Sequence, residues 1–438
     1  MSPLLIGALI GITTIAVLAT GIPVAFGLAI VAMAFLVIFD GFFSLGFVGE
    51  LFFSGIADFT LVSIPMFIAM GAAVASSPAG GDLYGALDRW LNRIPAGLAI
   101  SNLGACSIFA ALSGSSPATC AAIGKMGIPE MRKRGYPDGL ATGSIAAGGT
   151  LGILIPPSVT MIVYGISTGT SIGRLFISGI VPGLMLTLLF IAWSIVYAAR
   201  SGSLQMRDSR RFSLREKLES TPRVLPFLLL IGGILYVLYG GVATPSEAAG
   251  VGAMMCFVLI AVIYRVWQPR RIWQILTSST RESVMVMMII GAAALFSYTL
   301  STLFVTQSIA EWIAALDVNR WVLLGAINVF LLVAGFFLPP VAVIVMTAPI
   351  LLPLITQAGF DPYWFAVVLT INMEIGLITP PVGLNLYVIN GIAPDVGLQK
   401  ILAGALPFVL LMIFGILLLC VFPEIVTWLP DLLMGPGG

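Results

Sequence analysis

SGSSPATCAAIG at residues 113–124 and GGTLGILIPPSV at 148–159 belong to one apolar region, 110–165, that recurs later in the chain. The second copy, within residues 334–389, contains FLPPVAVIVMTA (337–348) and MEIGLITPPVGL (373–384). The two copies share helix-breaking residues in register: Pro129 with Pro353, Gly135 with Gly359, Gly152 with Gly376, and Pro156 and Pro157 with Pro380 and Pro381. Apolar segments that Gly and Pro interrupt at corresponding positions of two halves indicate the binding site of a secondary transporter.

The composition is that of a membrane protein. Of 438 residues, 59% are hydrophobic and 9% charged, and the mean hydropathy is +1.10, whereas soluble domains carry about 25% charged residues. A net charge of +1 makes nucleic acid an unexpected partner. The chain has no histidine and no C-x-x-C pair among its four cysteines, which argues against a transition-metal site and against a serine hydrolase.

Apolar segments of spanning length predict an all-α polytopic membrane protein. The first segment has no Lys or Arg before Arg89, so we expect a retained helix and not a cleaved signal peptide. Five regions are expected: N-terminal scaffold helices with an interfacial segment (1–60), a first transport repeat (61–181), central scaffold helices with a cytoplasmic loop at 200–223 (182–264), a second transport repeat (265–401), and a C-terminal helix with a tail (402–438).

Each repeat is expected to contain a re-entrant hairpin and a broken helix. The hairpins cover 95–130, with a tip at 113–117, and 321–359; the broken helices cover 136–165 and 362–390. A break facing lipid would leave backbone groups without partners, so such breaks occur where protein or a watery cavity surrounds them. A kinked spanning helix, with serine hydroxyls bonded to their own backbone, is the alternative for the first hairpin. Interfacial arms precede the hairpins, and the segments 264–281 and 282–300 are expected to be an arm and a span.

Basic residues set the predicted orientation. Lys and Arg cluster at 125–134, 200–223 and 265–281, and the expected spans place these clusters on one face, which should be cytoplasmic. Both termini then lie outside. The same count makes the two hairpins enter from opposite faces, which predicts an inverted repeat.

The motifs SGSSPATCAAIG…PPS and ITPPVGLNLYVI resemble the large membrane subunit of tripartite ATP-independent periplasmic (TRAP) transporters, in the ion-transporter superfamily. The resemblance covers nearly the whole chain. It implies a bacterial inner-membrane protein that works with a small four-helix membrane subunit and a periplasmic substrate-binding protein. It also implies elevator-type import of a small organic acid, such as a sialic acid or a C4-dicarboxylate, with sodium. The chain departs from the family pattern at Ser116, where Gly is expected, and at Pro339, where a small polar or acidic residue is expected.

Sodium is the coupling ion that this resemblance implies, and no other cofactor is expected. A hard cation takes oxygen ligands, and unwound helices offer free carbonyls. One predicted cage uses Ser113, Ser115, Ser116, Gly152 and Pro156; the other uses Gly335, Phe337, Leu338, Gly376 and the Thr379 hydroxyl.

The substrate is expected between the same elements. Helix N-termini at Pro117, Ser158 and Val382 carry partial positive charge that suits a carboxylate. The predicted substrate-binding residues are Ser116, Pro117, Thr119, Ser158, Pro340, Pro381 and Asn385. Asn385 could instead make an interhelical hydrogen bond. Glu374, an acid deep in the second broken helix, is a functional candidate, a subunit contact or a protonated spectator.

Other functions were weighed against transport. An intramembrane hydrolase could use a serine with Lys125 as base, but Lys125 sits near the cytoplasmic end of the hairpin and no oxyanion motif accompanies it. A passive channel needs a pore lined by rings of charge or carbonyls, whereas paired broken helices favour alternating access. A stand-alone sodium- or proton-coupled anion symporter of the same superfamily is the alternative within transporters.

Overall fold

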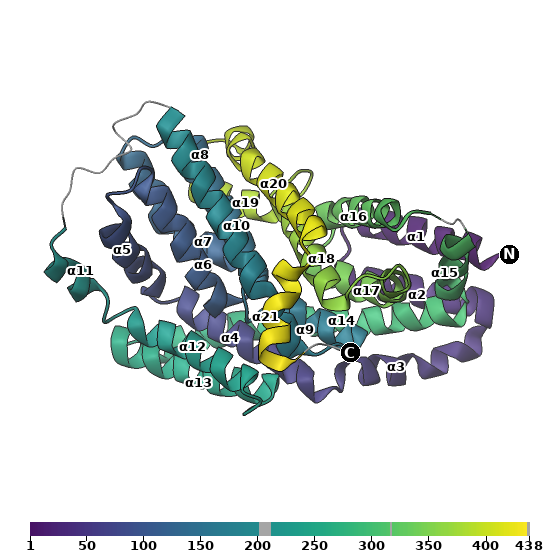
Figure 1. Ribbon diagram of the computed structural model, residues 1–438. Coiled ribbons are helices and arrows are strands. Elements are labelled where there is room, and N and C mark those ends of the chain that lie inside the picture. Colours follow the sequence, from purple (N-terminus) through teal and green to yellow (C-terminus); the bar gives the residue numbers. More distant parts are fainter. Residues whose placement is uncertain (201–211, 316–317, 436–438) are drawn as a thin grey trace.

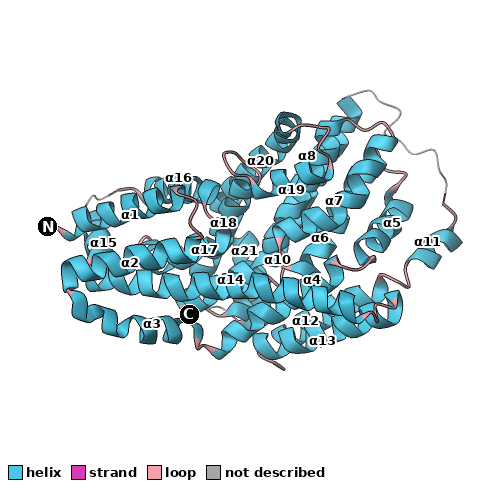
Figure 2. Ribbon diagram, turned by 180° about the vertical axis from the view of Figure 1, so that it is seen from behind, coloured by secondary structure: helices cyan, strands magenta, loops and turns pink. Residues whose placement is uncertain are grey.

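The computed structural model describes residues 1–200, 212–315 and 318–435, and all regular structure in these residues is helical (Figures 1 and 2). Part of the predicted loop at 200–223 therefore lies outside the described residues, as do 316–317 and 436–438. Six described helices are long and apolar enough to cross a bilayer, and two bent helix pairs could each add one. The predicted all-α polytopic class is confirmed.

The first half of the chain contains the elements up to the described end of the long helix α10. They are α1 (Pro3–Ala19), α2 (Val24–Asp40), η1 (Phe42–Phe47), α3 (Val48–Ile56), η2 (Phe59–Val62), α4 (Ser63–Ala75), α5 (Ala79–Leu91), α6 (Gly97–Ser113), α7 (Ser116–Lys133), α8 (Asp138–Thr150), η3 (Leu151–Ile153), α9 (Val159–Thr168) and α10 (Ile172–Arg200).

The second half continues with eleven helices in the described residues. They are α11 (Leu214–Ser220), α12 (Leu225–Tyr239), α13 (Pro245–Tyr264), α14 (Pro269–Thr302), α15 (Val305–Ala315), α16 (Arg320–Phe337), α17 (Pro340–Gln357), α18 (Pro362–Leu377), α19 (Leu384–Ile392), α20 (Leu398–Val421) and α21 (Glu424–Met434).

Three predicted boundaries fall inside helices of the structure. The expected junction between an arm at 264–281 and a span at 282–300 falls inside α14, which is a single helix because nothing between Pro269 at its start and Leu303 breaks it. The boundary at 181/182 falls inside α10, since Pro182 is accommodated within that helix. The boundary at 401/402 falls inside α20, and most of the expected C-terminal tail is the helix α21.

Glycine and proline end the helices around the two apolar repeats. Gly114 adopts a left-handed conformation (φ 57°) between α6 and α7, and Pro117 occupies the first turn of α7. A two-residue turn, 338–339, joins α16 to α17. Between α8 and α9 the chain passes through Pro156 and Pro157, and a similar non-helical segment, 378–383, separates α18 from α19.

The first helix of each broken pair forms the centre of the protein. In α8 every residue from Leu140 to Thr150 is buried, and in α18 every residue from Trp364 to Leu377 is buried. Small residues allow α8 to approach α20 closely: the backbone of Gly404 lies where a side chain on Gly143 would point. Such contacts between small residues are typical of helices packed within a bilayer.

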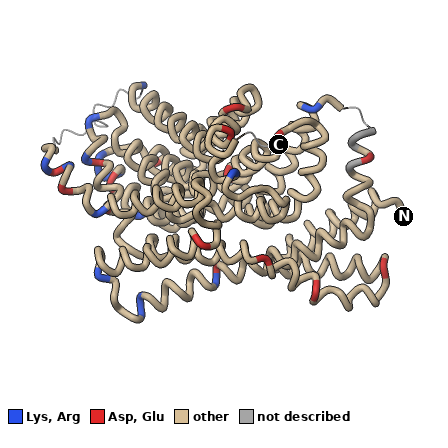
Figure 3. The backbone as a smooth tube through the Cα atoms, turned by 60° about the horizontal axis from the view of Figure 1, so that its bottom comes forward, with Lys and Arg blue, Asp and Glu red and all other residues tan. Residues whose placement is uncertain are grey.

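Other helices surround this centre. The long helix α14 contacts α2, α3, α4 and α17, while α13 packs on α4 and α12. In Figure 3 most of the Lys and Arg segments lie toward the left of the view, at the end of the molecule that carries α5 and α11. Arg132, near the end of α7, forms ion pairs with Asp138 of α8 and Asp395, which precedes α20.

Candidate functional site

The ends of the interrupted helices meet at one cavity of about 160 Å³. The first hairpin contributes residues 113–118, and the second contributes Pro340 and Val341. Ile153, Val159 and Thr160 come from the first broken helix, and Leu377 and Leu384 come from the second. Helices α4 and α14 complete the wall with Gly71 and Glu282, among others. Segments far apart in sequence thus form one site.

Proline leaves a free backbone carbonyl at each of the four helix ends. A helical carbonyl normally accepts a hydrogen bond from the N–H four residues later, and proline has no N–H. The residue four positions after the carbonyl is proline in all four cases: Ser113 precedes Pro117, Gly152 precedes Pro156, Gly335 precedes Pro339, and Gly376 precedes Pro380. Each of these carbonyl oxygens therefore lacks its helical donor and remains available to another ligand.

Glycine brings each broken helix against its hairpin. A Cβ atom on Gly152 would lie 2.7 Å from the carbonyl oxygen of Ser115. One on Gly376 would lie 2.5 Å from the carbonyl oxygen of Gly335. Real Cβ atoms essentially never approach this closely, so only glycine fits at either position. At both predicted cages, backbone groups of the broken helix and of its hairpin therefore lie side by side.

A buried polar network joins the first hairpin to the second broken helix. The Ser116 hydroxyl donates a hydrogen bond to Oε2 of Glu374 (3.0 Å) and accepts one from Nδ2 of Asn385 (2.8 Å). All three side chains are at most 1% exposed. Oε1 of Glu374 and Oδ1 of Asn385 have no hydrogen-bond partner among the described residues. Asn385 thus makes an interhelical hydrogen bond. Glu374 is buried inside the chain, at the contact between the two repeats.

The remaining polar groups of the first half bond locally. The Ser113 hydroxyl lies 2.8 Å from that of Thr119, which also donates to the carbonyl of Ser115 (2.9 Å). Thr119 is fully buried and does not line the cavity. Ser158 caps α9 and donates to the carbonyl of Ile153 (2.5 Å). These bonds hold the first tip and the first break in shape.

The second tip and break are more open. Phe337 is 63% exposed, and Pro381 is also exposed, whereas Ser113 and Ser158 are buried. Leu338 and Thr379 are partly buried. The Thr379 hydroxyl donates to the carbonyl of Ile375 (2.7 Å), so it is not free as the sequence had led us to expect, although its oxygen can still accept a cation.

The predicted residues divide into two groups. Those that line the cavity are Ser113, Ser115, Ser116, Pro117 and Pro340. Those that do not are Thr119, Gly152, Pro156, Ser158, Gly335, Phe337, Leu338, Gly376, Thr379, Pro381 and Asn385. Sequence reasoning missed Glu282, whose carboxylate belongs to the cavity wall. An acid within the apolar part of α14 was the available signal, and it was taken as a span boundary.

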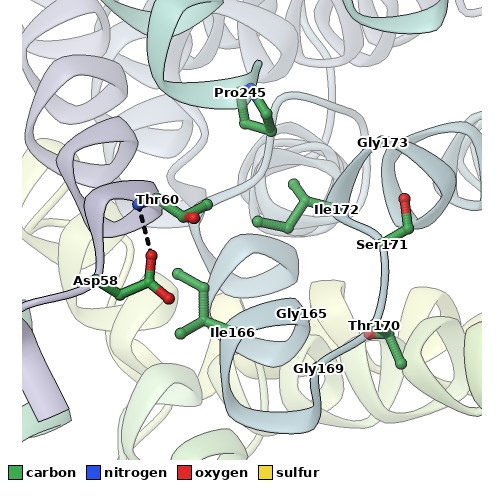
Figure 4. A pocket seen from close by; sticks show the side chains of 10 residues that line it. All are labelled: Asp58, Thr60, Gly165, Ile166, Gly169, Thr170, Ser171, Ile172, Gly173 and Pro245. Carbon is green, nitrogen blue, oxygen red and sulfur yellow. Dashed lines mark hydrogen bonds between the residues drawn. The ribbon is translucent and has the colours of Figure 1, made fainter. Parts of the chain in front are cut away.

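A second pocket, of about 350 Å³, lies at the far end of α9 (Figure 4). It contains none of the predicted site residues. Asp58, the charged residue among the described lining residues, accepts a hydrogen bond from the backbone N–H of Thr60 (2.7 Å) and caps η2. This carboxylate therefore has a structural role, and the cavity between the hairpin tips remains the candidate site.

Comparison with known proteins shows the family of this chain. Residues 12–425 match the family described as "Tripartite ATP-independent periplasmic transporter, DctM component". The C4-dicarboxylate TRAP transporter large permease protein DctM of Pseudomonas aeruginosa is 40% identical over 374 residues, which are 85% of this chain and 86% of that protein. The ectoine TRAP transporter large permease protein TeaC of Halomonas elongata is 32% identical, with coverage of 96% and 98%. The sialic acid TRAP transporter large permease protein SiaM of Vibrio cholerae is 30% identical, with coverage of 99% and 100%.

A solved structure has a similar fold. The YdaH transporter of Alcanivorax borkumensis superposes with a TM-score of 0.64 at 16% identity, over 92% of this chain and 91% of that one. At this level of identity the likeness concerns the fold alone.

Proposed function

The chain belongs to the DctM component family of tripartite ATP-independent periplasmic transporters, and on that premise we propose that it imports a small organic acid with sodium. It is a multi-pass inner-membrane protein of secondary transport and not an enzyme. We infer that a periplasmic binding protein delivers the substrate and that a small membrane subunit completes the transporter. The names of the relatives support an organic acid as the cargo.

One observation carries this proposal: two hairpin tips and two helix breaks converge on a single cavity, and each helix end presents a carbonyl oxygen without a helical donor. Oxygen atoms of this kind are the ligands that sodium takes. The N-termini of α7, α9, α17 and α19 lie at the same cavity, where their partial positive charge suits a carboxylate.

Two sodium sites follow from the proposal. The first would be formed by the tip residues Ser113, Ser115 and Ser116 with the break at Gly152 and Pro156. The second would be formed by carbonyl oxygens of Gly335, Phe337, Leu338 and Gly376 with the Thr379 hydroxyl. The close approach of Gly152 to Ser115, and of Gly376 to Gly335, supports both sets. Substrate would lie between the tips, against Ser116, Pro117 and Pro340.

Reconstitution in proteoliposomes tests the function. We expect substrate uptake only when the chain is combined with the small membrane subunit, the loaded binding protein and an inward sodium gradient. Omission of any one should abolish uptake. Robust uptake by the chain alone would instead indicate a stand-alone symporter, and flux that ignores the sodium gradient would indicate a channel.

Sidedness is tested separately. The clusters of basic residues lead us to propose that both termini are periplasmic and that α11 is cytoplasmic. A cysteine introduced by Arg215→Cys in α11 should resist an impermeant thiol reagent added outside the cell, while a reporter fused to the C-terminus should be accessible. Labelling of residue 215 from outside would reverse the orientation and exchange the faces from which the two hairpins enter.

A further inference from the structure

Among the residues that the structure describes, one ionisable side chain lines the cavity between the hairpin tips. Glu282 belongs to α14 and shares a face of that helix with Met285 and Val286, which line the same cavity. The neighbouring residues Ser283 and Met287 line a different pocket, between α14 and the helices α3 and α4. The direction of Glu282 toward the hairpin tips is therefore set by its position on a long continuous helix.

Glu282 has no partner in the part of the chain that the structure describes. No hydrogen bond or ion pair joins its carboxylate to another described residue, although it lines the same cavity as the tip residues Ser115 and Ser116. Glu282 is exposed, so its carboxylate lies on the open side of the cavity and is accessible to a ligand. Since no Lys or Arg is among the described lining residues, a cationic group of a ligand can pair with it.

The opposite side of the cavity has the complementary polarity. No Lys or Arg occurs among the described residues that line it. The positive potential comes from the N-termini of α7, α17 and α19, whose first residues Ser116, Pro340 and Leu384 lie at the wall. These ends attract a carboxylate. The cavity thus has one site for an anionic group and, on α14, one site for a cationic group.

We propose that Glu282 determines substrate specificity, and that the substrate is a small zwitterion with a carboxylate at the hairpin tips and an ammonium or amidinium group at Glu282. This inference rests on the proposed function and narrows its organic acid to one charge type. A dicarboxylate would bring its second carboxylate toward Glu282, and this like-charge contact disfavours it. The cavity is smaller than the pockets of about 300–1,000 Å³ that hold drug-sized ligands, which restricts the substrate to a small molecule.

β-Alanine and succinate provide a matched pair of probes. Each has a carboxylate at one end of a two-carbon spacer; the other end carries an ammonium group in β-alanine and a second carboxylate in succinate. Ectoine is a second zwitterion. Binding of each probe to the purified full chain in sodium-containing nanodiscs should be measured first, by thermal shift. Uptake by the complete transporter, with sodium inside and outside varied, should be measured next.

We expect the wild-type protein to prefer a zwitterion to succinate. Glu282→Gln should weaken zwitterion binding by roughly tenfold to a hundredfold, the usual effect of losing a charged hydrogen bond, and should reduce the discrimination against succinate. Glu282→Asp should keep most of the preference. Glu311→Gln changes an exposed acid on α15, away from the cavity, and should leave both probes unaffected.

Three results would overturn the inference. If the wild-type chain takes succinate at least as well as the zwitterions, with sodium-driven uptake that Glu282→Gln does not change, the specificity is wrong while the proposed function stands. If Glu282→Gln raises the sodium concentration needed for half-maximal uptake equally for every probe, Glu282 belongs to a sodium site. If no probe shows sodium-dependent uptake by the complete transporter, the proposed function fails, and the inference fails with it.

Discussion

Gly376→Ala tests whether the second broken helix and the second hairpin must touch. The added Cβ atom would lie 2.5 Å from the carbonyl oxygen and 2.7 Å from the carbonyl carbon of Gly335, whereas ordinary contact begins near 3.4 Å. Helices α16 and α18 would have to separate by about 1 Å at this point. Overpacking of this kind costs about 1–3 kcal/mol, and the better helix propensity of alanine offsets up to about 1 kcal/mol of it.

The matched control is Gly325→Ala. Gly325 also lies in α16, but a Cβ atom there would meet nothing within 4 Å. This substitution should raise the free energy of unfolding slightly, by up to about 1 kcal/mol, because alanine loses less backbone entropy in a helix. Both variants replace a helical glycine with alanine, but only the alanine at position 376 would collide with a neighbouring helix.

Two assays measure the effect of Gly376→Ala. They are unfolding in nanodiscs, with and without sodium, and sodium-driven uptake. Gly376→Ala should lower the free energy of unfolding by about 1–2 kcal/mol. It should also raise the sodium concentration for half-maximal uptake, because the displaced Gly335 carbonyl is a proposed ligand. A ligand that binds the native state stabilises it more when its affinity is higher, so sodium should protect this variant less. Identical behaviour of Gly376→Ala and Gly325→Ala in both assays would refute the reasoning.

Two further predictions concern single contacts. Thr379→Ala should raise the sodium concentration for half-maximal uptake roughly tenfold, as read from uptake curves, and Thr379→Ser should not, because serine keeps the hydroxyl oxygen. Arg132 lowers the pKa of Asp395, so the bridge between them should stabilise the loop 393–397 at neutral pH and be lost as the pH falls through that lowered value, below about 3.9. Hydrogen exchange of the loop should show this step, and Asp395→Asn should remove it.

The helix ends could be predicted from the sequence because proline and glycine act locally. Pro156 and Pro380 lack an N–H whatever surrounds them, so the carbonyls of Gly152 and Gly376 lose their helical donors in any fold. The spacing of these residues in two copies was enough to predict a transporter and, with the quoted motifs, the family, which the comparisons confirm. The inverted orientation of the two halves remains a prediction.

The cavity wall could not be predicted in the same way. Arg281 was taken as the end of an interfacial arm and Glu282 as the start of a span, because charged residues usually mark the edge of a span. In the fold, Glu282 lines a cavity whose wall includes residues 113–118, Val159 and Thr160, more than a hundred positions earlier in the chain. Periodicity describes which face of a helix is apolar, but it does not show which distant segment that face meets.

The bond network of Ser116 bears on how the site moves. Ser116 lies at the first tip, and its hydroxyl bonds to Glu374 and Asn385, which flank the second break. If the first hairpin moved away from the second broken helix, Glu374 would lose its hydrogen bond from the Ser116 hydroxyl, and the Asn385 amide would lose its acceptor. A hydrogen bond contributes about 0.5–1.5 kcal/mol, and a buried polar group left unsatisfied costs about 1–3 kcal/mol. This penalty favours a motion in which both halves of the site travel together against the surrounding helices, with the cavity kept intact, over one in which a single hairpin opens.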